Sequence, residues 1–253
     1  MDACRFNSPC TIYCAGPSGC GKTTLLLRMI EEWDKVFDQK PTKIYICYAH
    51  EQPAYDKIID IAPCPVELIK SLPNDLVIEP HSLLVIDDLM SECSKEIKDW
   101  HIRKAHHNQT ITLTLSQNLF EKEKDHRTTT LNAHYIILFK NPRDNSQITH
   151  FAKQFSPGET RFVVSSFHDA TRAPHSYLLF DLKQSTNNLF RVRSSVFPHE
   201  CRVYIPNSTS VKPHNGIESC AESTARATTV GNIKNEASSS NSKVRKSRSN
   251  RSY

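Results

Sequence analysis

The stretch Gly16-Pro17-Ser18-Gly19-Cys20-Gly21-Lys22-Thr23 lies between the apolar run Cys10–Cys14 and a helical pattern that begins at residue 24. It has the form G-x-x-x-x-G-K-[ST], and a strand, a glycine-rich turn and a helix follow in the order that a phosphate-binding loop requires. The glycines let successive backbone N–H groups point at one anion, and the start of the helix is positively polarised. The stretch therefore predicts a site for a nucleoside triphosphate with Mg²⁺.

Each polar group of this loop has a predicted task. Lys22 brings a compact cation to the β- and γ-phosphates, and the Thr23 hydroxyl is a ligand for Mg²⁺. Cys20 occupies a position that the motif leaves free, so a tolerated small side chain is favoured there over a reactive thiol. The residues expected to contact the nucleotide are Gly16, Pro17, Ser18, Gly19, Cys20, Gly21, Lys22, Thr23 and Thr24.

Length and composition indicate one domain with a tail in an intracellular protein. None of the apolar runs among the 253 residues approaches the ~20 residues that cross a bilayer, and an apolar signal core is lacking, so neither membrane insertion nor secretion is expected. The nine cysteines are irregularly spaced without a C-x-x-C pair, which supports neither a zinc ribbon nor a disulfide framework. The three histidines His101, His106 and His107 lack ligand-spaced partners and are expected at an exposed helix end.

The positive charge is concentrated after residue 200. Residues 201–253 carry nine Lys or Arg and three Asp or Glu, a net of +6, whereas the whole chain carries +5, which leaves −1 for residues 1–200. Residues 206–253 contain few large apolar side chains, so ordering them is not offset by burial. We expect a P-loop ATPase domain at 1–202 and a disordered basic tail at 203–253. The cluster at 243–251 fits a nuclear localisation signal, a nucleic-acid-binding tail or a solvated end.

Apolar runs alternate with helical patterns, which predicts the α/β class with a mostly parallel sheet flanked by helices. Several runs do not alternate with polar residues, as expected for strands buried on both faces. The expected strands are Thr11–Ala15, Lys43–Tyr48, Ser82–Asp87, Thr110–Leu115, Tyr135–Lys140, Tyr177–Asp181 and Leu189–Arg193. The expected helices are Lys22–Val36, Pro65–Leu72, Ser91–His107, Ser146–Gln154 and Thr160–Ala170.

Two carboxylates end the apolar run that begins at Leu83. Ligands of open α/β sheets bind at the carboxyl ends of the strands, so Asp87 and Asp88 are expected to face the phosphate loop. We expect Asp87 to hold the magnesium shell and Asp88 to polarise the attacking water. A solvated turn is the alternative reading of such a pair.

Two further polar positions complete the expected site. Gln117 ends the next strand and is favoured as the residue that senses the γ-phosphate, with Asn118 or a plain strand-end turn as alternatives. Arg143 follows a proline turn after the strand that ends near residue 140, where an arginine finger supplied to a neighbouring subunit would fit. Arg127 is the second candidate, and a simple surface arginine is the competing interpretation for each.

The motifs together resemble the genome-packaging ATPases of the FtsK–HerA superfamily, above all the poxvirus-type enzymes and their relatives in Polinton-like and adintovirus-like elements. The resemblance covers about residues 8–200. Besides the phosphate loop, it is carried by Ile86-Asp-Asp-Leu-Met90, Ser116-Gln-Asn-Leu-Phe120, Leu131-Asn-Ala-His-Tyr135, Phe139-Lys-Asn-Pro-Arg-Asp144 and His175-Ser-Tyr-Leu-Leu-Phe-Asp181.

This resemblance implies a RecA-like ATPase that forms a homo-oligomeric ring, binds ATP between subunits and drives double-stranded DNA into a capsid. It implies a location in the nucleus, a virus factory or the virion, and a capsid protein as partner. It places Lys22 and Thr23 on phosphate and magnesium, Asp87 and Asp88 in the acidic motif, Gln117 as sensor and Arg143 as finger. Asp88 departs from the Glu of some relatives, which puts the identity of the base in doubt. The segment Lys95–His107 is a weak candidate for DNA contact.

Three alternatives share the same loop. A small-molecule kinase usually has an arginine-rich lid, which is not obvious here. A helicase or DNA-repair ATPase would have the same fold. A silent nucleotide-binding relic would be expected to lack competent side chains, whereas every catalytic position above holds one.

Overall fold

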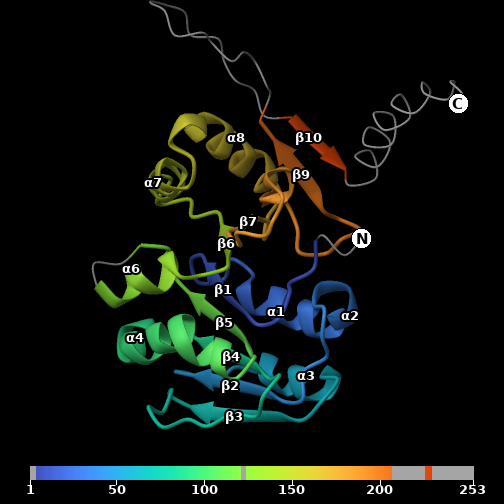
Figure 1. Ribbon diagram of the computed structural model, residues 1–253, viewed down its shortest axis with the longest axis vertical. Helices are drawn as coiled ribbons and strands as arrows, with labels where there is room; N and C mark the ends of the chain where they lie inside the picture. The colour runs from blue at the N-terminus through green and yellow to red at the C-terminus, as the bar shows by residue number, and fades with distance from the viewer. Residues whose placement is uncertain (1–3, 121–123, 207–225, 230–253) are drawn as a thin grey trace, which may run out of the picture.

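The computed structural model of the protein describes residues 4–120, 124–206 and 226–229 (Figure 1). These residues form one ten-stranded mixed sheet with helices packed against both of its faces. The predicted α/β class with a mostly parallel central sheet is confirmed.

Six neighbouring strands form the parallel part of the sheet. Their order across the sheet is β6-β1-β5-β4-β2-β3, and every adjacent pair in it is parallel. Strand β5 therefore separates β1, which leads into the phosphate loop, from β4, which ends in the acidic pair, while all three end at the same edge. The strands are β1 (Cys10–Ala15), β2 (Ile44–Tyr48), β3 (Val66–Lys70), β4 (Leu83–Asp87), β5 (Ile111–Ser116) and β6 (Tyr135–Phe139).

An antiparallel extension continues the sheet beyond β6. It consists of β7 (Tyr177–Asp181), β8 (Val192–Arg193), β9 (Arg202–Ile205) and β10 (Arg226–Thr229). The strand expected at Leu189–Arg193 is shorter than expected, because Asn188–Phe190 forms the 3₁₀ turn η4 before β8. Strand β9 runs past the expected domain end at residue 202, and its Val203 and Tyr204 are buried. A disordered tail at 203–253 otherwise stays a prediction, because most of it lies outside the described residues.

Side chains of the parallel strands alternate between two apolar cores. In β1, Ile12 and Cys14 join one core and Tyr13 and Ala15 the other, as the two-residue period of a strand requires. The first core is covered by α1 (Lys22–Glu31), α2 (Trp33–Val36) and α3 (Ala54–Ile61). The second is covered by α4 (Met90–Asp99), α7 (Ser146–Phe155) and α8 (Thr160–Ala170), with α6 (Lys124–Leu131) beside α4 (Figure 1).

Two helix predictions need correction. The helix expected at Lys22–Val36 is interrupted at Glu32, which has φ −98° and ψ 32°, so α1 and α2 are separate. The helix expected at Pro65–Leu72 is wrong, because Val66–Lys70 is the edge strand β3, paired in parallel with β2. Residues of β3 contact the first core while Glu67 is exposed. A run this short does not distinguish the 3.6-residue period of a helix from the two-residue period of a strand. Helices α3 and α6 were not expected.

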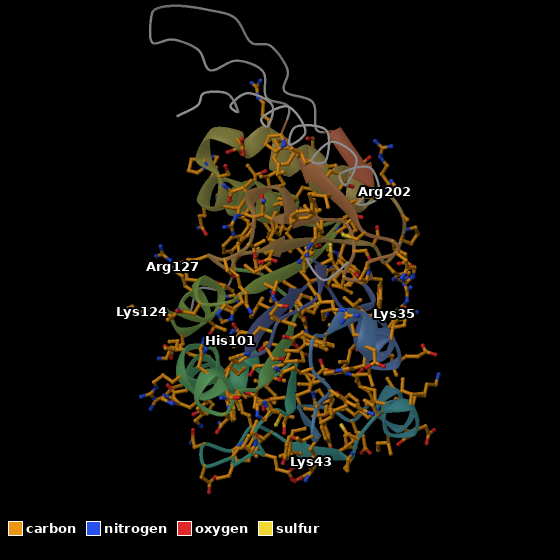
Figure 2. The ribbon with its side chains drawn as sticks, turned by 45° about the vertical axis from the view of Figure 1, so that its right-hand side comes forward. Lys35, Lys43, His101, Lys124, Arg127 and Arg202 are labelled. Carbon is orange, nitrogen blue, oxygen red and sulfur yellow. The ribbon has the colours of Figure 1, made fainter. Side chains whose placement is uncertain are left out.

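Helix α4 continues through a π-helical turn at Trp100–Lys104 into α5 (Ala105–His107). The π turn directs His101 toward the sheet, where it is buried and its Nε2 lies 2.9 Å from the Thr114 hydroxyl (Figure 2). The expectation that His101 is exposed is therefore wrong, and burial lowers its pKa to about 3. His106 and His107 are exposed as expected.

Neither a membrane-spanning helix nor a cluster of metal ligands is found in the part of the chain that the structure describes. Its helices include none that is both long and apolar enough to span a bilayer. The same residues contain no cluster of three or more His, Cys, Asp or Glu that could hold a metal ion by themselves.

Candidate active site

The phosphate loop curls around the ammonium of its own lysine. Lys22 Nζ donates to the carbonyl oxygens of Gly16, at 2.6 Å, and Pro17, at 3.2 Å. Gly21 precedes α1 with φ 110°, a left-handed conformation that glycine adopts without strain. A Cβ on Gly16 would lie 2.6 Å from Phe139 Cβ, so the loop also needs glycine there to pack against β6. Burial raises the pKa of the Cys20 thiol, which agrees with a tolerated side chain and not with an activated thiol.

The predicted magnesium ligands are joined through one amide. The Thr23 hydroxyl donates to Gln52 Oε1 over 3.4 Å, and Gln52 Nε2 donates to Asp87 Oδ2 over 3.1 Å. The Tyr55 hydroxyl donates to the same carboxylate oxygen over 2.9 Å. Asp87 is only 4% exposed, and burial raises its pKa above the ordinary value although Tyr55, Lys22 and Gln52 favour the ionised form. Strand β4 thus places a buried carboxylate near the Thr23 hydroxyl at the start of α1, with the Gln52 amide between them.

This donor set fits Mg²⁺. The ion prefers oxygen ligands and commonly takes one or two protein carboxylates, with phosphates and waters completing its shell. Thr23 and Asp87 offer a hydroxyl and a carboxylate oxygen on either side of the Gln52 amide. Sequence reasoning missed Gln52 and Tyr55. Their position after β2, whose end neighbours that of β4, was the available signal.

The second acid has a different environment from the first. Asp88 is exposed, has φ 56°, and accepts two hydrogen bonds from Gln117 Nε2, at 3.1 Å to Oδ1 and 2.9 Å to Oδ2. Its backbone N–H donates to the Leu115 carbonyl at the end of β5. Strand β5 therefore brings Gln117 to Asp88. The Tyr13 hydroxyl donates to the backbone carbonyl of the neighbouring Asn118.

The two arginine candidates lie at different places. Arg143 is exposed in the turn after β6, which is fixed by a hydrogen bond from its backbone N–H to Asn141 Oδ1. Lys140 and Pro142 of the same turn line a cavity of about 460 Å³ together with loop residues 17–20. Arg127 is exposed on α6, and Figure 2 shows it pointing outward from that helix. The structure thus places the Arg143 turn, but not α6, against a cavity of the phosphate loop.

A histidine without a predicted role contacts the loop. His175 has φ 60°, its Nδ1 donates to the Cys20 carbonyl over 3.1 Å, and its Cβ lies 3.2 Å from the position of a Cβ on Gly21. The segment 172–176 that carries it also lines the 460 Å³ cavity and a second one of about 510 Å³ beside α1. The motif His175–Asp181 was noted in the sequence, but nothing in it indicated contact with the loop.

Comparisons with known proteins give likenesses of fold only. No protein-family model and no curated protein matches the chain. Among solved structures, the genome packaging NTPase B204 from Sulfolobus turreted icosahedral virus 2 is 13% identical with a TM-score of 0.44, over 71% of this chain and 94% of that one. The cytoplasmic domain of the Thermomonospora curvata Type VII secretion ATPase EccC is 15% identical with a TM-score of 0.43, over 68% of this chain and 24% of that one. Such scores carry no conclusion about activity.

Proposed function

We propose that this protein is an ATPase that hydrolyses ATP with Mg²⁺ at the carboxyl edge of its sheet. One observation carries the proposal: Asp87 is connected to Thr23 through Gln52, while the adjacent Asp88 is held by Gln117. A phosphate loop, an oxygen-rich metal position and a fixed exposed carboxylate are the parts that phosphoryl transfer to water requires.

The residues divide the work as follows. Lys22 exchanges the carbonyls of Gly16 and Pro17 for phosphate oxygens, and the N-terminus of α1 faces the same charge. Thr23 and Asp87 hold Mg²⁺, which supplies charge neutralisation on the phosphates when bound. Asp88 accepts a hydrogen bond from the attacking water, and Gln117 fixes the orientation of that carboxylate.

The finer proposal is a motor that translocates double-stranded DNA as a ring, in packaging of a viral genome into a capsid. It rests on the motif resemblance to poxvirus-type packaging ATPases and their relatives in Polinton-like elements. DNA contact would be mainly to phosphates and hence sensitive to salt. In the segment Lys95–His107, Lys98 is paired with Asp125 and Arg103 with Asp99, so these cations already have partners within the subunit. That weakens the segment as a DNA-contact surface.

The test is steady-state phosphate release by the purified full chain, with and without duplex DNA, combined with mass photometry. We expect hydrolysis that requires Mg²⁺, is lost in Asp88→Asn, is stimulated by duplex DNA and accompanies a ring. Hydrolysis without DNA stimulation or a ring would support the ATPase and contradict the motor. Transfer of phosphate to a nucleoside or metabolite would contradict both and indicate a kinase, and strand displacement on forked DNA would indicate a helicase.

A further inference from the structure

Two cysteines from opposite ends of the folded chain meet in a small separate core. Cys4 and Cys201 are 4% and 2% exposed, and with Val203 they form an apolar cluster apart from the two large cores. The Cys201 thiol donates to the Cys4 sulfur, and the two sulfur atoms lie 4.0 Å apart. Both are free thiols. A disulfide has an S–S distance of about 2.0 Å, so a small approach of the two side chains would join them.

The charge around the pair makes the two thiols unequal. The Arg193 side chain is fully buried next to them and pairs with Asp181 at 3.2 Å. The Cys201 hydrogen bond is the largest cause that lowers the pKa of Cys4 below its ordinary value, and the Arg193 charge adds to it. The same contact raises the pKa of Cys201. Cys4, which accepts the hydrogen bond, therefore loses its proton more readily than Cys201, and this asymmetry favours thiol oxidation.

The cysteines inside the sheet lack this asymmetry. Burial raises the pKa of Cys10 to about 12, and it raises the pKa of Cys47 to about 12 as well. Cys14 is also buried and its pKa is raised for the same reason. Oxidation is therefore expected to favour the pair at the sheet's antiparallel end over these three buried cysteines of the parallel strands.

We propose that Cys4 and Cys201 form a redox-modification site at which a peroxide joins them in an intramolecular disulfide. Hydrogen peroxide is hardly larger than water, so it suits a pair this buried better than a bulky disulfide oxidant. The Cys4 thiolate attacks the O–O bond, forming a sulfenic acid and hydroxide, which takes up a proton to become water. Cys201 sulfur then attacks the sulfenic sulfur and loses its proton, and the hydroxyl leaves as a second water. The thiols lose two electrons and the peroxide gains them.

The bond would fix the segment that rests on the phosphate-loop helix. Glu200, next to Cys201, binds the Arg28 guanidinium of α1 at 2.6 and 2.9 Å, and Arg28 lies 3.7 Å over the Phe197 ring. A disulfide from this segment to Cys4 closes a loop of nearly the whole domain, and closing a long loop stabilises a fold by restricting its unfolded state. The oxidised protein is expected to unfold at a higher temperature than the reduced protein.

The test is to treat the reduced full chain with a slight excess of hydrogen peroxide, block the remaining thiols under acid quench and map disulfides by mass spectrometry. We expect a Cys4–Cys201 cross-linked peptide and a faster-migrating monomer on a non-reducing gel, both reversed by dithiothreitol. Cys64→Ser, which removes a half-buried cysteine elsewhere, should keep both signals, and Cys201→Ser should replace them with a dimedone adduct on Cys4.

Other outcomes overturn the proposal. Wild-type protein in which Cys4 and Cys201 stay alkylatable while other thiols oxidise has no redox site at this pair. A disulfide that maps to other cysteines, or oxidised glutathione that acts as fast as peroxide, contradicts the selectivity argued from burial. Because the mapping uses wild-type protein, a folding defect in a variant does not affect this decision.

Discussion

Gln117 donates its side-chain amide to both carboxylate oxygens of Asp88, at 3.1 and 2.9 Å, so the second acid of the pair is held from the neighbouring strand. Its neighbour Asp87 is buried and accepts instead from Gln52 and Tyr55. The two adjacent carboxylates therefore have different environments. Asp87 is buried and connected to Thr23 through Gln52, whereas Asp88 is exposed to solvent. Substitutions of the two carboxylates should therefore have different effects.

Replacing the loop lysine tests nucleotide binding. Lys22→Ala removes the cation expected on the phosphates, and a hydrogen bond to a charged group is worth about 1.5–3 kcal/mol, so affinity should fall at least tenfold. Titration with a fluorescent ATP analogue measures this. Lys35→Ala is the matched control, because Lys35 is an exposed lysine on α2 that pairs with Glu32 at the surface. Equal binding by Lys22→Ala and wild type would contradict the assignment of the loop.

The contact between Asp88 and Gln117 predicts that their substitutions are not additive. Asp88→Asn and Gln117→Ala should each reduce turnover by about 10²-fold or more while leaving the affinity for ATP nearly unchanged, because the first removes the carboxylate that accepts from the water and the second removes the hydrogen bonds that orient it. The double variant should lose little more than the worse single variant. Rates of phosphate release and separately measured ATP affinity provide the cycle. Losses that multiply would mean that the two side chains act independently.

The raised pKa of Asp87 predicts a pH-dependent cost to stability. The pKa of this carboxyl group is higher in the folded state than its ordinary value of 3.8. Its ionisation therefore lowers the stability of the fold as the pH rises from the ordinary pKa to the folded-state pKa, and the full loss of stability is present above both values. Asp87→Asn should therefore raise the melting temperature at pH 8 in the presence of EDTA, by ~2–4 °C for each kcal/mol, and change it little below pH 4.

Two controls accompany that measurement. Asp88→Asn should reproduce only a minor part of the gain, because Asp88 is exposed and its charge raises the pKa of Asp87 less than burial does. Wild-type protein with Mg²⁺ and an ATP analogue should recover stability, since a ligand that binds only the folded state stabilises it, whereas Asp87→Asn should recover less. A lower melting temperature for Asp87→Asn at pH 8 would show that the hydrogen bonds from Tyr55 and Gln52 outweigh the desolvation of the charge.

The sequence predicts the parts of the site whose position follows from the order of the strands along the chain and from their apolar pattern. The loop and the acidic pair each follow a buried apolar run, so parallel pairing had to bring their carboxyl ends to one edge. Gln52 and Tyr55 are harder to find this way, because Gln52 lies in the polar segment after β2 and Tyr55 lies in the first turn of α3, a helix that the sequence pattern does not predict. His175 was unpredictable for a similar reason, since it reaches the loop from a connection 155 residues from Cys20. The helix prediction at Pro65–Leu72 fails because pairing with β2, and not the residue pattern of this short segment, determines that it forms strand β3.

Packing of His175 against Gly21 gives a prediction that separates two kinds of strain. Gly21→Ala places a Cβ at φ 110° and 3.2 Å from His175 Cβ, so it should weaken ATP binding and lower stability by about 1–2 kcal/mol. If backbone conformation dominates, adding His175→Gly, which removes the crowding Cβ, leaves the defect in place. If crowding dominates, the double variant recovers binding. We expect no recovery, and His175→Ala alone should retain the loop while weakening binding modestly through loss of the bond to Cys20.

Arg143 tests whether one subunit completes the site of another. Its guanidinium is exposed, and its turn is held at Asn141 independently of that side chain. Arg143→Ala should therefore keep the fold and the affinity for ATP but reduce turnover by 10³-fold or more if it acts as a finger. Arg127→Ala on α6 tests the second candidate in parallel, and we expect it to keep turnover because this exposed arginine lies in a different part of the fold.

Mixing variants decides which subunit receives the arginine. Arg143→Ala protein retains Asp88, and Asp88→Asn protein retains Arg143, so a mixed ring contains some interfaces with both intact residues if the arginine reaches across. Turnover of the mixture should then exceed the sum of the two separate proteins. A mixture as inactive as its components would place the arginine in its own subunit's site, next to the cavity that Lys140 and Pro142 share with the loop. Normal hydrolysis by Arg143→Ala alone would show that the arginine has no role in turnover.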